Sequence, residues 1–503
     1  MTGKVTLVGA GPGDPGLLTL RGLEALQSAE VVVYDRLVGE EILNLIPASA
    51  QRVDVGKHPG HHPVPQWSIN EILLKEAQKG RNVVRLKGGD PYLFGRGAEE
   101  LELLQKHGVP FEVVSGVTSA LAAPAAAGIP VTHRDWASSV HIVTGHARSG
   151  KALDLNFSAL TAAGGTCVFL MGMAALEGIC TGLLAAGMDP DTPAAVVERG
   201  TLPGQRKVVS TLARLAAEVR SAGLSNPAVI VVGPVAALSE ALDWRSARPL
   251  TGQRVIVTRS AGRGEALCRS LRALGAEVLN CPTVSTVSTV DSEKLTKILN
   301  LSKQIQWIAF TSAAGVEAVF SALWEAGLDA RSLGAVRFAA IGPATARALE
   351  AQRLRADFVP ALYDSEHLAR GLAERLEGGT VLLLRSAIAT PTLSRVLTEA
   401  GASWLEVPVY DARLPEEPDP ALTAWLERGE SLVTFSSGST VRGFVRALEP
   451  GADLSRVRGV SIGAQTAAVC AQNGIPTLVA AEATERGLID LILNQFGERR
   501  AEP

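Results

Sequence analysis

Cysteine is scarce in this chain and occurs in no motif. The 503 residues include 5 cysteines, and no two of them form a CxxC pair. This usage excludes a disulfide framework, gives no sign of a zinc site and is typical of reduced, packed thiols. We therefore expect a cytoplasmic protein.

An excess of positive charge is also lacking. Lys plus Arg total 48 against 51 for Asp plus Glu, a formal net charge of −3. No broad positive field is available to attract nucleic acid or an anionic membrane, so an anionic ligand needs a local cluster of cations. No window approaches the roughly 20 unbroken apolar residues of a membrane span, and the first residues do not form a signal peptide. We expect small-molecule partners, with neither nucleic acid nor membrane among them.

What the chain has is α/β patterning. Apolar residues make up 47% of it, enough for several cores. Short β-branched runs, such as residues 5–8 and 255–258, alternate with longer amphipathic stretches, which predicts α/β architecture. The alternation pauses in a polar, proline-containing stretch at 245–250. We therefore predict a first domain, a linker and a second domain at residues 1–245, 246–253 and 254–495.

The second domain repeats itself. VIVTRS at 255–260 recurs as VLLLRS at 381–386, and AIGPATA at 340–346 recurs as SIGAQTA at 461–467. The offsets, 381 − 255 = 126 and 461 − 340 = 121, differ little, as expected of a duplicated unit with small loop deletions. Two similar α/β units that face each other would form a cleft.

The first domain opens with a glycine-rich turn. The strand at 5–8 runs into residues 9–16 (GAGPGDPG), and Asp35 ends the next strand. A glycine-rich turn followed by an acidic residue about 20 positions on is typical of NAD binding, so an NAD-dependent oxidoreductase is one interpretation. Pro12 and Pro15, however, lack amide hydrogens and fix φ, so this loop cannot present a continuous row of N–H donors to a pyrophosphate. We favour a loop built for close approach of a ligand.

A second glycine-rich turn follows the third clear strand. Gly88, Gly89 and Asp90 come after the strand at 83–86, and another small-residue turn lies at 116–120. Turns at the carboxyl ends of neighbouring parallel strands face one crevice, where open α/β sheets bind ligands. Bare glycine backbone admits a flat ligand, and Asp90 supplies an acceptor for a hydroxyl or ammonium group. Together these turns predict a pocket for an adenosine-like ligand that carries amino-acid groups.

Residues 3–240 resemble uroporphyrinogen-III C-methyltransferase. The motifs, in order, are LVGAGPGDP (7–15), VYDRLV (33–38), VGK (55–57), RLKGGDP (85–91), FGRG (94–97), GIPVTHR (128–134) and TGH (144–146). The resemblance implies a two-lobed α/β methylase, usually a homodimer, that uses S-adenosylmethionine (SAM) to methylate C2 and C7 of uroporphyrinogen III and so makes precorrin-2. Ser115 departs from the family, which usually has proline there, so we expect this loop to be less rigid than in the family.

The resemblance also implies roles for individual residues. Asp35 matches the proton acceptor and Lys57 the proton donor. As a pyrrole carbon attacks the methyl group, the macrocycle becomes cationic and must lose a proton, which a carboxylate can accept. The alternatives are a helix cap for Asp35, a solvated loop lysine or carboxylate anchor for Lys57, and core packing for Met171. The SAM pocket would be lined by Pro12, Gly88, Gly89, Asp90, Leu93, Thr118, Ser119, Met171 and Gly200.

Cationic side chains are expected to bind the carboxylates of the substrate. The candidates are Arg36, Lys57, Arg134 and Arg148. Three histidines, His58, His61 and His62, lie in a proline-containing stretch with no carboxylate or cysteine at ligand spacing. We therefore expect no metal site.

The second domain shows few catalytic candidates. It has no Ser/His/Asp set and no Cys/His pair, but a hydroxyl or glycine recurs at its predicted strand-to-helix turns, as at Ser312 and Ser437. Such turns can direct N–H groups and hydroxyls at carboxylates, or they can be ordinary helix caps.

This domain resembles uroporphyrinogen-III synthase. The motifs are VTRS (257–260), FTS (310–312), IGPATA (341–346), VPVY (407–410), SIG (461–463) and TA (466–467). The resemblance implies a cofactor-free enzyme that cyclises hydroxymethylbilane with inversion of ring D and loss of water. Lobe one would span about 254–285 plus 411–495, and lobe two about 286–410. Tyr410 matches a proposed proton donor, with packing at the junction of the lobes as its alternative, and Thr345 and Thr466 match substrate contacts.

We therefore predict a bifunctional α/β enzyme of tetrapyrrole biosynthesis whose second domain makes the substrate of the first. One alternative is a methyltransferase fused to a non-catalytic tetrapyrrole-binding module. The other is the NAD-dependent oxidoreductase described above.

Overall fold

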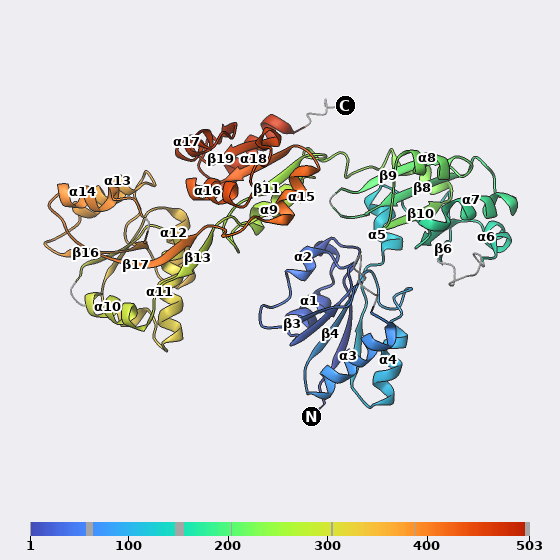
Figure 1. Ribbon diagram of the computed structural model, residues 1–503, viewed down its shortest axis with the longest axis horizontal. Helices are drawn as coiled ribbons and strands as arrows, with labels where there is room; N and C mark the ends of the chain where they lie inside the picture. The colour runs from blue at the N-terminus through green and yellow to red at the C-terminus, as the bar shows by residue number, and fades with distance from the viewer. Residues whose placement is uncertain are drawn as a thin grey trace. The chain divides into compact units, whose positions relative to one another are not determined.

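The computed structural model describes residues 2–56, 64–145, 155–202, 204–302, 305–387 and 389–497. The chain forms two compact units, Met1–Gly252 and Gln253–Pro503, and each contains two five-stranded sheets (Figure 1). The predicted α/β class is confirmed. Of the helices in these ranges, none is both long enough and apolar enough to cross a membrane.

The first sheet of the first unit is parallel throughout, in the order β3-β2-β4-β1-β5. The strands β1, β2 and β4 are buried along almost their whole length because helices cover both faces, whereas the edge strand β3 is mostly exposed. One face packs against α3 and α4 and the other against α1 and α2. The elements are β1 (Val5–Gly9), α1 (Leu20–Gln27), β2 (Val31–Tyr34), α2 (Glu40–Leu43), β3 (Gln51–Asp54), α3 (Gln66–Gln78), β4 (Val83–Lys87), α4 (Gly97–Lys106) and β5 (Phe111–Val114).

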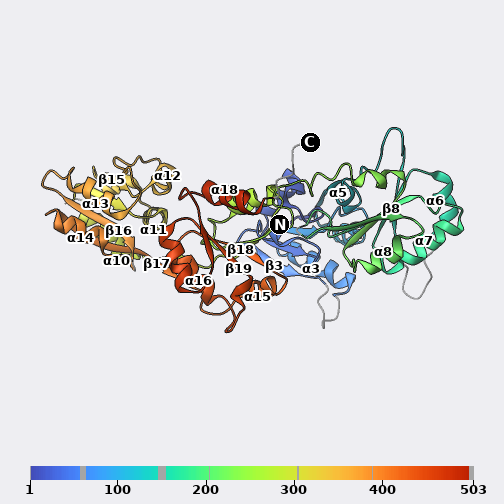
Figure 2. The same cartoon turned by 90° about the horizontal axis from the view of Figure 1, so that it is seen from above.

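The second sheet of this unit is mixed, in the order β6-β7-β10-β8-β9, with only β6 and β7 parallel. Helix α5 (Ser119–Ala126) packs on one face, and α6 (Phe157–Ala163), α7 (Leu176–Ala185) and α8 (Leu215–Ser221) pack on the other. Both views show α7 and α8 beside β8 (Figures 1 and 2). The strands are β6 (Val140–Thr144), β7 (Thr166–Leu170), β8 (Pro193–Glu198), β9 (Arg206–Thr211) and β10 (Ala228–Val232).

In the second unit one sheet is parallel, in the order β12-β11-β18-β19-β20. Its strands are β11 (Arg254–Val257), β12 (Glu277–Asn280), β18 (Ser431–Phe435), β19 (Val457–Ser461) and β20 (Thr477–Val479). The helices in this part of the chain are α9 (Glu265–Ala273), α15 (Pro420–Glu427), α16 (Gly438–Arg446), α17 (Ala464–Gln472) and α18 (Glu485–Phe496).

The other sheet of the second unit has the order β13-β17-β16-β14-β15, with β13 antiparallel to β17. Its strands are β13 (Ser285–Ser288), β14 (Trp307–Phe310), β15 (Arg337–Ala340), β16 (Thr380–Ser386) and β17 (Ser403–Arg413). The helices between them are α10 (Ser292–Ser302), α11 (Ala313–Glu325), α12 (Pro343–Ala351), α13 (Ser365–Ala373) and α14 (Thr392–Glu399).

The repeat found in the sequence occupies equivalent places in these two sheets. In the repeat, β11 corresponds to β16, β18 to β14 and β19 to β15. The three strands of each half are neighbours in the same order, β11-β18-β19 in one sheet and β16-β14-β15 in the other. The repeat is therefore present in the structure as well as in the sequence.

Candidate functional site

Three turns meet at the carboxyl ends of β1, β4 and β5. The Ala10 N–H donates to the Lys87 carbonyl at 2.7 Å, and the Gly89 N–H donates to the Gly11 carbonyl at 2.7 Å. A Cβ on Gly9 would collide with the backbone of Gly116, so glycine is needed where these turns pack. The turns form one continuous floor, as expected for neighbouring parallel strands.

The two glycines after β4 are not equivalent. A Cβ on Gly88 would lie 2.9 Å from Cβ of Leu37, so that side is already filled by protein. A Cβ on Gly89 would find its nearest neighbours, Thr118 Cα and Ser119 N, at 4.0 Å. The Cβ side of Gly89 is thus open and that of Gly88 is filled, and contact of either backbone with a ligand stays a prediction.

The carboxylate of Asp90 accepts hydrogen bonds from the backbone of these turns. Its Oδ1 accepts the N–H groups of Tyr92 at 2.8 Å and Leu93 at 3.2 Å, and its Oδ2 accepts the N–H of Gly116 at 3.1 Å. Three backbone donors therefore share this carboxylate, and its role as an acceptor for a ligand stays a prediction. Leu93 packs against the core of the second sheet.

Beside the floor lies a hollow that three predicted cofactor residues line together. Pro12 comes from the loop after β1, Ser119 from the start of α5 and Gly200 from the loop after β8. Thr118 is the N-cap of α5, and its hydroxyl accepts the N–H of Ala120 at 3.2 Å. Met171, just after β7, is half exposed. The structure therefore gathers Pro12, Ser119 and Gly200 around one opening.

The loop after β1 does not open a long helix. It enters the short 3-10 helix η1 (Pro15–Leu17), which Asp14 caps, and α1 begins only after Thr19, its N-cap. A dinucleotide-binding turn needs a helix N-terminus aimed at the pyrophosphate. This geometry argues against the NAD-binding interpretation.

Asp35 is bonded to a buried arginine. Arg85 donates from Nη2 to Oδ1 of Asp35 at 2.7 Å, with side-chain exposures of 2% and 30%. The N-cap of α2 is Gly39, so the alternative assignment of Asp35 as a helix cap was wrong.

The arginine belongs to a larger buried ion cluster. Oε1 of the fully buried Glu100 accepts from Nε of Arg85 at 3.2 Å and from Nζ of Lys87 at 2.7 Å. Burial lowers the pKa of the Lys87 ammonium, with Arg85 acting in the same direction and Glu100 opposing it. Sequence reasoning missed this cluster, although two cations within the short apolar strand β4 were its visible signal.

The predicted substrate cations are only partly described. Arg36 and Arg134 are exposed, whereas Lys57 and Arg148 lie outside the described residues, as do the three clustered histidines. Within the ranges that the structure describes, no group of three or more His, Cys, Asp or Glu side chains could hold a metal. The roles of these cations stay predictions.

The cysteines are packed thiols, as expected. All five are buried, and none of them is in a disulfide. Burial raises the pKa of Cys167 and Cys180 to about 11 and that of Cys281 to about 12. None of these three is activated as a nucleophile at neutral pH.

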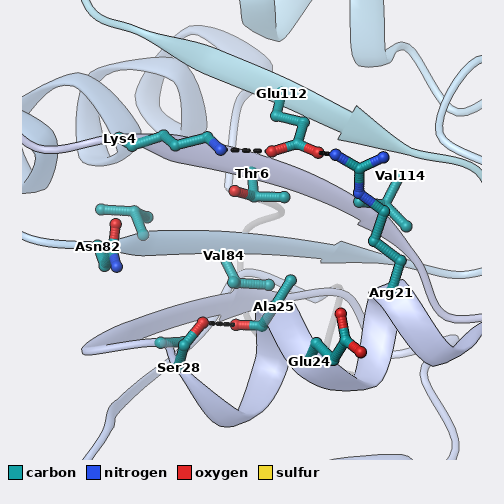
Figure 3. A pocket seen from close by; sticks show the side chains of 12 residues that line it. Lys4, Thr6, Arg21, Glu24, Ala25, Ser28, Asn82, Val84, Glu112 and Val114 are labelled. Atoms are coloured by element: carbon teal, nitrogen blue, oxygen red, sulfur yellow. Dashed lines mark hydrogen bonds and ion pairs between the residues drawn. The ribbon is translucent and has the colours of Figure 1, made fainter.

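Another hollow lies between α1 and the strands β1, β4 and β5, mostly toward the amino ends of these strands (Figure 3). Lys4 and Arg21 both pair with Glu112 there, near the amino ends of β1, β4 and β5. Its position separates it from the glycine turns, so it is not part of the candidate site.

In the second unit Tyr410 is a half-buried residue of β17. Its side chain packs against the core that contains Phe310 and Val409. This contact favours the alternative of a packed tyrosine over a proton donor in an open cleft. Thr345 and Thr466 occupy equivalent positions in α12 and α17 but are only 3% and 5% exposed, so their hydroxyls are poorly placed for a bulky substrate.

The hydroxyls at the strand-to-helix turns cap helices. Ser312 accepts the N–H of Gly315 at 3.1 Å, and Ser437 accepts that of Thr440 at 3.3 Å. Thr484 caps α18 in the same way. Helix capping, one of the two interpretations drawn from the sequence, is confirmed for these three.

Comparison with known proteins matches each unit to a family. Residues 4–216 match the tetrapyrrole (corrin/porphyrin) methylases, and residues 265–490 match uroporphyrinogen-III synthase HemD. A porphyrin biosynthesis protein HemD of Ruminiclostridium josui is 43% identical over 497 residues, 98% of each chain. The chain belongs to the family that fuses these two enzymes. It is thus a tetrapyrrole-biosynthesis enzyme with a methylase unit and a synthase unit, and membership of a methylase family agrees with the predicted need for a methyl donor.

Other relatives match about half of the chain. The siroheme synthase of Citrobacter koseri is 54% identical over 244 residues, which are 48% of this chain and 52% of that protein. The chain therefore spans about half the length of the siroheme synthases it matches.

Two solved structures from Thermus thermophilus each match about half of the chain. The uroporphyrin-III C-methyl transferase complexed with S-adenyl homocysteine is 42% identical, with 47% of this chain and 100% of that one covered and a TM-score of 0.41. A mutant uroporphyrinogen III synthase is 23% identical, with 48% and 98% covered and a TM-score of 0.36.

Proposed function

We propose that the synthase unit cyclises hydroxymethylbilane to uroporphyrinogen III, and that the methylase unit transfers two methyl groups from SAM to C2 and C7 to give precorrin-2. The observation that carries the first unit's part is the floor of glycine turns beside Asp35, which has room for a ligand at Gly89 and whose first turn enters a short 3-10 helix, unlike the turn of a dinucleotide-binding fingerprint. The family of each unit supports the overall reaction class.

The residues around the floor fit SAM as a ligand. A side chain at Gly89 would fill the open space opposite Thr118 and Ser119, and the hollow that includes Pro12 and Gly200 adjoins that space. When bound, SAM supplies a methyl group on a sulfonium that a carbon nucleophile can attack directly. The protein's contribution is therefore mainly to hold the two reactants in line and to exclude water.

Asp35 is the group that takes up the proton from the methylated macrocycle. Arg85 holds Oδ1, and Oδ2 has no hydrogen-bond partner among the described residues. Asp35 follows the carboxyl end of β2 and is partly exposed. It lies at the same edge of the sheet as the glycine turns. It can stabilise the cationic ring and then accept its proton on Oδ2. Lys57 as donor, and Arg36, Arg134 and Arg148 as carboxylate ligands, complete the proposal.

For the synthase unit we propose that catalysis comes mainly from holding the substrate in the conformation that cyclises, and that Tyr410 contributes little as a proton donor. Loss of water from hydroxymethylbilane leaves a reactive carbon, and a cleft that holds the chain coiled favours closure on the inverted ring. The packed position of Tyr410 supports a modest contribution from any single donor. Fusion of the units raises the concentration of uroporphyrinogen III near the methylase.

One conversion tests both halves. The full chain is incubated with hydroxymethylbilane and SAM under anaerobic conditions, and the tetrapyrroles are separated and weighed by mass spectrometry. We expect a dimethylated product with SAM and uroporphyrinogen III without it. If only the uncatalysed isomer I forms, the second unit is a binding module. In a separate binding measurement with the purified protein, retention of NAD but not of SAM would overturn the methylase assignment. Light scattering of the full chain tests the homodimer that the resemblance implies.

A further inference from the structure

The loop after β8 is held in a strained backbone conformation. Arg199 has φ of 50° and Thr201 has φ of 73°, on either side of Gly200. Residues with a Cβ adopt this left-handed region only when their surroundings impose it, and such positions cluster at ligand sites. Arg199, Gly200 and Leu202 line the hollow described above.

Residues 199–202 of this loop pack against α5 and against the loop after β1. A Cβ on Gly200 would collide with Ala123 of α5, and a Cβ on Gly13 would collide with the side chain of Leu202. A small shift of the loop therefore changes the walls of the hollow that Pro12 and Ser119 complete.

Two side chains fix the backbone of Thr201. Its N–H donates to Oε1 of Gln205 at 2.8 Å, and Gln205 in turn donates to the carbonyl of Ala126 at 3.0 Å. Its carbonyl accepts from Nη1 of Arg245 at 3.2 Å. Gln205 follows the loop directly, whereas Arg245 comes from a part of the chain beyond the methylase match, which ends at residue 216.

The segment that carries Arg245 is itself anchored. Asp243 pairs with Lys207 at 2.7 Å, and Nε1 of Trp244 donates to the carbonyl of Ala125 at 3.0 Å. The guanidinium of Arg248 lies 4.5 Å from the centre of the Trp244 ring. We call residues 243–248 the anchor segment, and the first unit ends just after it, at Gly252.

We propose that Arg245 is a positioning residue for the methyl-donor site, because its hydrogen bond to Thr201 holds the strained loop against the hollow. The inference rests on the proposed SAM-binding function. It makes the ligand affinity of the methylase unit depend on a residue close to the junction with the synthase unit. Burial lowers the pKa of Arg245, and Arg248 acts in the same direction, whereas Asp14 and Asp243 oppose the shift.

Calorimetric titration of the full chain with S-adenosylhomocysteine tests this. We expect Arg245→Met to raise the Kd about tenfold, as for loss of one charge-assisted hydrogen bond. The KM for SAM should rise in parallel while kcat at saturating SAM and the rate of cyclisation stay within about twofold. Arg245→Lys should restore part of the affinity, because it keeps a donor of shorter reach.

Arg248→Met is the matched control, since it removes the same charge from the anchor segment without touching Thr201. It should bind S-adenosylhomocysteine as the wild type does. Equal affinity in Arg245→Met and wild type, or equal weakening in Arg248→Met, would overturn the inference. If Arg245→Met does not fold, weaker binding in Arg245→Lys than in Arg248→Lys supports it, and equal binding overturns it. Wild-type protein that binds no S-adenosylhomocysteine would instead refute the proposed function.

Discussion

The polar side chains singled out at the candidate sites of the two units make different contacts. In the methylase unit Arg85, Lys87 and Glu100 are buried as ions, and through Arg85 they hold Asp35 at the end of a strand. In the synthase unit Ser312 and Ser437 cap the helices that follow β14 and β18. The difference matches the chemistry proposed for each unit: one must manage a developing positive charge and a proton, whereas the other must chiefly shape a ring closure.

The largest expected effect tests the charged side of this comparison. Asp35→Ala should lower methylation by about 10²- to 10⁴-fold, because it removes the proton acceptor, and should leave cyclisation unchanged. Both rates come from chromatography of the tetrapyrroles formed from hydroxymethylbilane. Equal loss of the two activities in a folded protein would contradict the separate roles of the units.

The ion cluster gives the second prediction. Arg85→Met takes the buried partner from Asp35 and leaves Glu100 with Lys87 as its only cation in the cluster, so we expect the methylase unit to lose about 3 to 5 kcal/mol of stability. Calorimetric unfolding of the full chain measures it, with the transition of this unit identified by its response to S-adenosylhomocysteine.

Arg220→Met is the control for that experiment. Arg220 pairs with Glu177 on the surface at 2.8 Å, and both side chains are more than two-thirds exposed. The loss should be below about 1 kcal/mol. A similar loss in both variants would mean that the buried cluster is no more than an ordinary ion pair.

The third prediction concerns the synthase unit. Tyr410→Phe keeps the packing of the ring against the core and removes only the hydroxyl, so the rate of cyclisation should change less than about threefold. The fraction of isomer III in the product is the measurement. A loss of a hundredfold or more in folded protein would show that this unit, like the methylase unit, relies on one proton-transfer group.

The smallest effect concerns the caps. Ser437→Ala should destabilise the synthase unit by about 1 kcal/mol, and Ser437→Gly by only a few tenths, because glycine is itself tolerated as an N-cap. Chemical unfolding followed by tryptophan fluorescence measures both, and cyclisation by the folded variants should match the wild type. Lost activity without lost stability would place Ser437 in the substrate site instead.

Local patterns predicted the strands that are apolar and the turns that are rich in glycine. The strand at the edge of the first sheet escaped this reasoning: β3 (QRVD) is polar and mostly exposed, so β4, which we expected as the third strand, is the fourth. The turn at Asp90 was expected, but the direction of its carboxylate was not, because an aspartate in a turn can face its own backbone or a ligand with equal local preference. For Tyr410 the sequence likewise left two alternatives, a proton donor or a tyrosine packed at the junction of the lobes. The motif VPVY does not determine what the side chain contacts.

The order of residues alone determined where strands end, where glycine must allow close approach and that the second unit is a repeat, because periodicity and turn chemistry act over a few neighbouring residues. Only the tertiary structure decided that Arg85 meets Asp35 across 50 residues and that Arg245 meets Thr201 across 44. Those contacts depend on the lateral order of strands and on how the chain packs against both sheets of one unit. Such long-range arrangements minimise the free energy of the whole unit, and no short stretch of sequence contains them.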